Sequence, residues 1–210
     1  RESLAPLTRQ AGCLASTLAK KMKTEFIDRL IEHSTFVEIY DDNAEESFFG
    51  YVIQQTEDFL QLEAYDGEGR PEGILITEFE EVARIRWEGN ERELIESMIS
   101  SRADQPKIKL ENIGTILKEV NQHYGHVCIT LGGHGVDKLY IGSIEEIDEE
   151  FIVLHEYGTR DQKCRNRMLL RMEDVSRVQA GGIYETNLIK QFGANQSEIS
   201  TPLRAPRSTT

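Results

Sequence analysis

The chain repeats its own pattern, and this internal repeat constrains the fold more than any other feature of the sequence. Three segments of the first half return in the second half in the same order: 26–40, 48–65 and 73–89 match 116–130, 140–157 and 167–182. The offset between matched residues grows from 90 to 93 along the repeat, and only across polar, glycine-rich segments. Loops accept insertions while strands keep their register, so the sequence predicts two copies of one small unit.

Each copy has the pattern of a helix, five short strands and a closing helical segment. Thr24 and Asn112 are typical helix N-caps, and Gly125 is suited to end the second helix. Runs with a period near two predict the strands: 36–40, 48–54, 59–65, 74–77 and 83–87 in the first copy, and 127–131, 139–147, 151–157, 168–171 and 176–179 in the second. The closing segments are 91–100 and 184–192.

Five short, strongly bent antiparallel strands bury their apolar face best by curling into a small barrel. A glycine in the second strand of each copy, Gly50 or Gly142, precedes an acidic turn and an apolar third strand, and the segments ILITEFEEVARI and MLLRMEDVSRV follow. In these features each copy resembles the Sm-like (LSm) family. The resemblance implies a mainly β fold with short helices: two tandem Sm-like (SH3-type) five-stranded barrels, each preceded by an N-terminal helix. It places 79–81 and 172–174 at a one-turn helix between strands four and five.

The repeat also predicts the domain boundaries. We expect the first, strongly acidic barrel at 22–101, a linker at 102–111 and the second barrel at 112–192. Residues 1–21 have the composition of an unstructured or non-native extension, and 193–210 of a disordered tail.

The resemblance implies RNA binding only as an alternative. Sm-like proteins that bind uridine-rich RNA carry Asp-x-x-x-Asn in the first motif and Arg-Gly or Lys-His in the second. Only Asp148 and Arg171 match that pattern, and both lie in the second copy.

Charge divides the two copies. The net charge is −13, but residues 22–101 hold 6 basic and 21 acidic side chains, while 102–192 hold 12 and 14. A polyanion-binding role is therefore disfavoured for the first copy and only weakly for the second. Charged residues interrupt every apolar run, which excludes a helical membrane span. The cysteines Cys13, Cys128 and Cys164 form no CxxC pair, which favours a reducing cytoplasmic compartment and a buried thiol at Cys128.

Two sets of residues are candidates for function. Val82, Ile85, Val175 and Val178 are expected at the barrel core or at the assembly edges. The second set is the basic run near the loop between strands three and four of the second copy: Arg160, Lys163, Arg165, Arg167 and Arg171. This run has three interpretations: a solvated charged hairpin, a set of phosphate contacts, or a dock for the acidic first copy of a neighbouring chain.

Other motifs favour ordinary structural roles. His123, His126 and His134 lack a further convergent ligand at metal spacing, and the glycines of LGGHG precede no GK[ST], so a hairpin turn is expected there. No nucleophile, base and orienting group can be assembled, and acidic pairs such as Glu80-Glu81 lack the pattern of a calcium loop. The sequence predicts no enzyme activity, no cofactor and no metal.

We therefore expect a non-enzymatic assembly or binding module, because the exposed edges of strands four and five are templates for pairing. The expected partner is the chain itself, as a pseudo-dimer within one chain, a ring or a higher homo-oligomer, or another protein. The alternatives are RNA binding by the basic loop of the second copy, and sequestering of a small ligand or nucleotide between the barrels.

Overall fold

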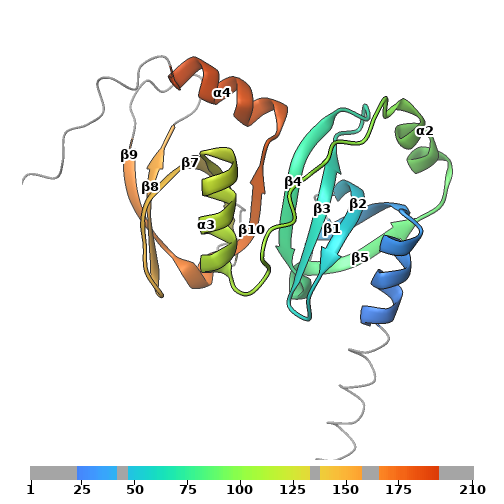
Figure 1. The fold of residues 1–210 in the computed structure, drawn as a ribbon, viewed down its shortest axis with the longest axis horizontal. Coiled ribbons are helices and arrows are strands. Elements are labelled where there is room, and N and C mark those ends of the chain that lie inside the picture. Colours follow the sequence, from blue (N-terminus) through green and yellow to red (C-terminus); the bar gives the residue numbers. More distant parts are fainter. Residues whose placement is uncertain (1–22, 42–46, 133–137, 158–165, 194–210) are drawn as a thin grey trace, which may run out of the picture.

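A computed structural model describes residues 23–41, 47–132, 138–157 and 166–193. Its strands are β1 (Phe36–Asp41), β2 (Ser47–Gln55), β3 (Phe59–Tyr65), β4 (Pro71–Glu78), β5 (Val82–Trp87), β6 (Val127–Leu131), β7 (Lys138–Ile147), β8 (Phe151–Glu156), β9 (Asn166–Arg171) and β10 (Val175–Ala180). They form one antiparallel sheet of ten strands in the order β5-β1-β2-β3-β4-β10-β6-β7-β8-β9 (Figure 1). The prediction of a mainly β fold with short helices is therefore confirmed.

The helices lie at corresponding positions in the two halves. The first half begins with a helix at 23–32 and ends with α2 (Asn90–Met98); the second begins with α3 (Ile113–Tyr124) and ends with α4 (Ile183–Gly193). One-turn helices, η1 (Phe79–Glu81) and η2 (Met172–Asp174), stand where the sequence predicted them. Asn112 caps α3 by accepting the Thr115 N–H at 2.8 Å, and Gly125 ends it at φ 73°. Thr24, in contrast, lies inside the first helix.

The prediction of two closed barrels is wrong. Each half, here called the first unit (23–98) and the second unit (113–193), keeps its five strands in the linear order five-one-two-three-four. A closed barrel requires strand four to pair with strand five of the same unit. Instead β4, which is strand four of the first unit, pairs with β10, which is strand five of the second. The edges that would close one barrel are used to join the two units.

The two units also share apolar contacts. Along β3, Leu60, Leu62 and Ala64 point into the core of the first unit, as the period of two requires. Phe59 lies on the opposite face, and there it joins Ile74 and Ile76 of β4 in the core of the second unit. The outer face of β3 and β4 in the first unit is therefore part of the second unit's core.

The segment between the units lies along β3 as an ordered strap. Figure 1 shows it running between β4 and α3. The buried Glu63 carboxylate accepts hydrogen bonds from the Arg102 guanidinium at 2.9 and 2.7 Å and from the Ala103 N–H at 3.0 Å. The buried Gln61 side chain donates to the Pro106 carbonyl at 2.7 Å and accepts the Ile108 N–H at 3.1 Å. Because an unpaired buried carboxylate is costly, Glu63 fixes the strap in place.

None of the helices in the described part of the chain is both long enough and apolar enough to cross a membrane.

Candidate functional site

The junction between the units is a short antiparallel ladder of β4 and β10. Its four residue pairs are Thr77–Arg177, Ile76–Val178, Leu75–Gln179 and Ile74–Ala180. Ile76 and Val178 are 1% and 0% exposed, so the centre of the ladder is fully covered. The pairing is backbone hydrogen bonding reinforced by apolar burial, the combination that makes a strand edge a specific binding surface.

Two glycines close one end of this ladder. Gly73 has φ 74° and Gly181 has φ 87°, a region that favours glycine. A Cβ placed on Gly73 would lie 2.0 Å from the Ala180 carbonyl oxygen and 2.8 Å from Gly181 Cα. A side chain at Gly73 would separate β4 from β10, and one at Gly181 would lie 2.8 Å from Cε1 of the Tyr124 ring. Gly73 is therefore the residue that allows the close approach of the two strands.

Arg177 carries charge into the junction. Its side chain is almost fully buried, and its guanidinium carbon lies 4.3 Å from the centroid of the Phe48 ring. Arg84, the matching residue of β5 at an offset of 93, lies 3.9 Å from the Tyr40 ring in the same manner. Strand five of each unit, β5 and β10, therefore carries an arginine that lies against an aromatic ring of the sheet.

Two strand edges remain open at the ends of the sheet. In the described part of the chain, β5 pairs with β1 alone and β9 pairs with β8 alone. β5 is strand five of the first unit and β9 is strand four of the second. They are therefore the same two strand types that pair at the junction.

The predicted edge and core residues lie at these places. Val175 and Val178 of β10 are buried in the second core. Val82 and Ile85 of β5 are partly buried against the first core, on the open edge.

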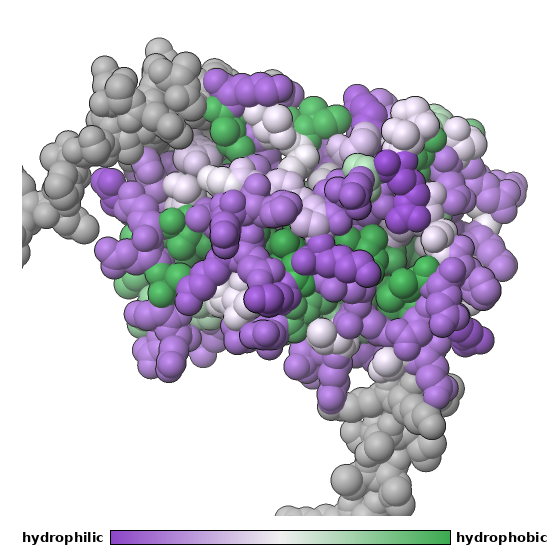
Figure 2. Space-filling model, in the orientation of Figure 1, coloured by the Kyte–Doolittle hydropathy of each residue, from purple (hydrophilic) through white to green (hydrophobic). Residues whose placement is uncertain are grey.

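Large apolar side chains are exposed at both open edges. Leu169 of β9 is 64% exposed, and Trp87 of β5 is 42% exposed although its ring lies 4.8 Å from that of Phe26. Figure 2 shows that hydrophobic residues on the visible face form small separate patches among hydrophilic ones. A single exposed apolar side chain is ordinary on a protein surface. Leu169 and Trp87, however, each lie on a strand with an unpaired edge.

The basic run is only partly described. Arg160, Lys163 and Arg165 lie outside the described residues. Arg167 Nε contacts Glu145 Oε2 at 2.7 Å, and Arg171 contacts Glu173 at 2.9 Å. The guanidinium groups of Arg167 and Arg171 thus have carboxylate partners within the second unit.

Asp148 holds a turn. Its carboxylate accepts the N–H groups of Glu150 and Phe151 at 2.8 and 2.7 Å, and these hydrogen bonds hold the pKa of Asp148 below its usual range. In the first unit Thr56 occupies the matching position and accepts the Phe59 N–H at 3.0 Å through its hydroxyl. The aspartate that matched the RNA motif has a structural function in the β7–β8 turn.

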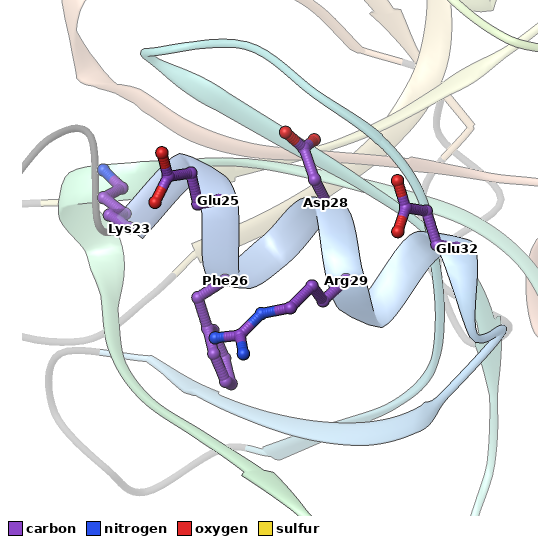
Figure 3. Close-up of a pocket in the computed structure, with 6 residues that line it drawn as sticks. All are labelled: Lys23, Glu25, Phe26, Asp28, Arg29 and Glu32. Carbon is purple, nitrogen blue, oxygen red and sulfur yellow. The ribbon is translucent and has the colours of Figure 1, made fainter.

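Two surface hollows among the described residues are candidates for a site. The first, of about 810 Å³, is lined by the helix at 23–32 alone, and in Figure 3 Phe26 and Arg29 point to one side of that helix while Asp28 and Glu32 point to the other. It is a shallow surface around a helix rather than an enclosing site. The second, of about 580 Å³, is lined by residues of both units: Glu78, Ile113, Glu149, Glu150, Phe151, Arg171, Met172 and Glu173.

The buried polar residues beside α4 form a third candidate. His126 Nδ1 lies 3.0 Å from the Tyr124 carbonyl and Nε2 lies 3.4 Å from Glu185, which also accepts the Gly182 N–H at 2.9 Å. Burial, with Glu185 as a further cause, raises the pKa of the Cys128 thiol well above its usual range. A buried thiol held in its neutral form is a poor nucleophile, so this cluster fastens α4 to the sheet. Among the described residues no group of three or more His, Cys, Asp or Glu could hold a metal ion.

Comparisons of the chain with models of protein families, with curated proteins and with solved structures give no match. The candidate site therefore rests on the geometry of the junction and the two open edges. The sequence pointed to strands four and five, but it did not reveal the glycine pair or the strap. The signal for the glycine pair was Gly73, because the matching residue of the second copy is Asn166 and not a glycine.

Proposed function

We propose that the protein is a non-enzymatic assembly module, in which β5 of one chain pairs with β9 of another as β10 pairs with β4 inside the chain. The observation that carries the proposal is that, among the described strands, the internal junction leaves one unpaired edge of each type, on β5 and on β9. Pairing of unlike edges is heterologous, so repeated addition gives a ring or a filament of Sm-like units.

The repeat gives the register of the proposed contact. Applying the offset of 93 to the junction pairs places Ile85 opposite Leu169 and Trp87 opposite Arg167. The first pair covers the most exposed leucine of β9 with an aliphatic side chain. The second brings a guanidinium to an indole ring, which is the most favourable partner for such a cation.

The same alignment predicts that the contact between chains is weaker than the junction. The residues that match Gly73 and Gly181 are Asn166 and Glu88. Glu88 already holds a positive φ of 69°, and Asn166 carries a side chain where the junction has no room for one. The pairing between chains is therefore reversible, while the internal junction is permanent.

Sedimentation velocity over a concentration series tests the proposal. We expect association in the micromolar range, as is usual for small, wet interfaces. Leu169→Lys should weaken it by about tenfold or more because it introduces an unpaired charge at the contact. Leu94→Lys is the matched control, since Leu94 is 62% exposed on α2 and lies on neither edge strand.

A second variant tests the register by a gain. The double replacement Asn166→Gly with Glu88→Gly restores the glycine pair of the junction at the outer edges, and it should tighten association. A chain that stays monomeric at about 100 μM, with both the native and the double-glycine sequence, would refute the proposal.

A further inference from the structure

Half of the basic side chains of the first copy gather at the open edge strand β5. Residues 22–101 hold six basic side chains, and three of these are Arg84, Arg86 and Arg92. Arg84 and Arg86 are exposed and alternate with Ile85, which packs on the first core, so they lie on the face of β5 that points away from that core. Arg92, in the first turn of α2, is buried. The most acidic part of the chain therefore presents a local basic surface at one strand edge.

The three guanidinium groups share one carboxylate. Arg92 contacts the buried Glu38 at 3.0 Å. Arg86, whose side chain is 45% exposed, reaches the same Glu38 at 3.4 Å and donates to the Tyr40 hydroxyl at 2.7 Å. The Arg84 guanidinium lies 3.9 Å from the centroid of the Tyr40 ring, and among the described residues it forms no ion pair. Because a guanidinium has five N–H donors, both exposed arginines keep donors for an added anion.

Strand five has an edge that accepts an extended segment. In the second unit this edge, on β10, pairs antiparallel with β4, and residues 84–86 match 177–179 of β10 at the offset of 93. A strand added to β5 in the register of the junction places one residue opposite each residue of 84–86. Residues directly opposite each other in an antiparallel pair point to the same face. The added strand therefore brings two alternate side chains to the two exposed arginines.

The side chains of β5 determine what the added strand should carry. Carboxylates opposite Arg84 and Arg86 would form charge-assisted hydrogen bonds, and apolar side chains would cover Ile85 and Trp87 on the other face. Glu88 follows β5, so a basic residue fits opposite it. Along the added strand, the preferred order is basic, apolar, acidic, apolar, acidic.

Strand β9 of a second copy does not carry this pattern. In the register derived from the junction, Leu170 lies opposite Arg84 and Met168 lies opposite Arg86. Both of these apolar side chains pack in the core of the second unit. Pairing with a second copy thus gives the two guanidinium groups no carboxylate, and a strand with acidic side chains at these positions is the better electrostatic match.

We propose that β5 binds an extended segment of another protein by strand addition, with acidic side chains at the two alternate positions opposite Arg84 and Arg86. The segment occupies the edge that assembly uses, so its binding also stops the addition of further chains at β5. This second step rests on the proposed function, whereas the binding of the segment does not.

Fluorescence anisotropy with a labelled peptide of sequence Thr-Lys-Val-Glu-Val-Glu-Val-Thr tests the binding. The full chain carries Leu169→Lys, which weakens the competing contact of β9. We expect micromolar affinity, and about tenfold weaker binding when both glutamates of the peptide are replaced by glutamine, since two exposed ion pairs are lost. Arg84→Glu with Arg86→Glu should weaken binding of the glutamate peptide by at least the same factor. Arg70→Glu is the matched control, because Arg70 is an exposed arginine of the first unit in the β3–β4 turn, and it should change the affinity by less than about twofold.

An exchange of charges keeps the test decisive if a variant is damaged. A peptide with lysine in place of both glutamates should bind the doubly reversed protein more tightly than it binds the native sequence. Equal affinity of the glutamate and glutamine peptides would overturn the proposal, and so would a doubly reversed protein that keeps its circular dichroism spectrum but prefers neither peptide.

Sedimentation velocity of the native chain separates the two steps. The glutamate peptide should reduce the share of associated chains, and association that persists when the peptide is bound would place the peptide away from β5 and contradict the proposal. A chain that does not associate at all refutes the proposed assembly alone, because the anisotropy measurement still shows whether β5 binds the peptide.

Discussion

Replacement of Gly73, a residue of β4, by alanine should weaken the junction more severely than the same replacement at Gly67 or Gly125. Two separate effects act at this position. Its φ of 74° disfavours an L-residue, and the added Cβ would lie 2.0 Å from the Ala180 carbonyl oxygen. Since that oxygen belongs to the backbone of β10, only movement of a strand relieves the clash.

Two other glycines separate these effects. Gly125 has φ 73° but nothing within 4 Å of its Cβ position, so Gly125→Ala should cost only the backbone term of about 1–2 kcal/mol. Gly67 has open space and no positive φ, so Gly67→Ala should be neutral or slightly stabilising. Gly73→Ala should add about 1–3 kcal/mol of overpacking to the backbone term, about 3 kcal/mol in total.

Urea unfolding of the three variants measures these values. With a slope of about 2 kcal/mol/M, the Gly73→Ala midpoint should fall by about 1.5 M. Trp87, the only tryptophan, reports on the first unit, while far-ultraviolet circular dichroism reports on both. If the junction is weakened, the two transitions should separate in Gly73→Ala and coincide in Gly125→Ala. A cost for Gly73→Ala no larger than that for Gly125→Ala would refute the assigned function of the glycine.

Two further predictions concern charged side chains. Because its ionised form accepts hydrogen bonds in the folded chain and its pKa is lowered, Asp148 stabilises the turn above the pKa of unfolded aspartate, and this contribution is lost as pH falls below about 4. Asp148→Thr, which copies Thr56, should flatten that loss in thermal melts from pH 6 to 3, and an unchanged profile would contradict it. Arg92 contacts Glu38 at 3.0 Å with both side chains buried, so Arg92→Leu should cost about 3 kcal/mol in urea unfolding. Adding Glu38→Met should recover much of that cost, and a double variant as unstable as the single one would contradict the pairing.

The sequence predicts the local elements well where pattern and fold agree. Both ends of β3 and of β6 match the predicted strands, and the one-turn helices lie where they were expected. The predicted β4, at 74–77, begins too late, because the strand extends back to Pro71. Proline and glycine argue against a strand interior, but here they form an irregular edge that lets β10 approach. A contact between the units therefore overrides the local preference.

Barrel closure could not be predicted from the repeat. Alternating apolar residues specify that a strand has a buried face, but they do not specify which strand will pair with its edge. The order five-one-two-three-four leaves the same two edges in each unit, and closure within a unit and pairing between units satisfy the same pattern. The position of the strap could not be predicted from the sequence either, since its partners Gln61 and Glu63 look like ordinary polar positions of a strand. Their burial is the signal, because a buried carboxylate needs a partner from outside the strand.

The division of charge gives the proposed assembly a direction. The first unit has few basic side chains, and one of them, Arg92, is buried against Glu38, so its charge offsets an internal carboxylate rather than the surface. The surface of that unit is consequently strongly acidic. Pairing β5 with β9 brings this surface to the nearly neutral second unit, whereas pairing two first units would place like charges together. The head-to-tail contact is therefore the electrostatically preferred one. Because the whole chain is still negative, the association should strengthen between about 20 and 300 mM salt, where screening reduces the remaining repulsion.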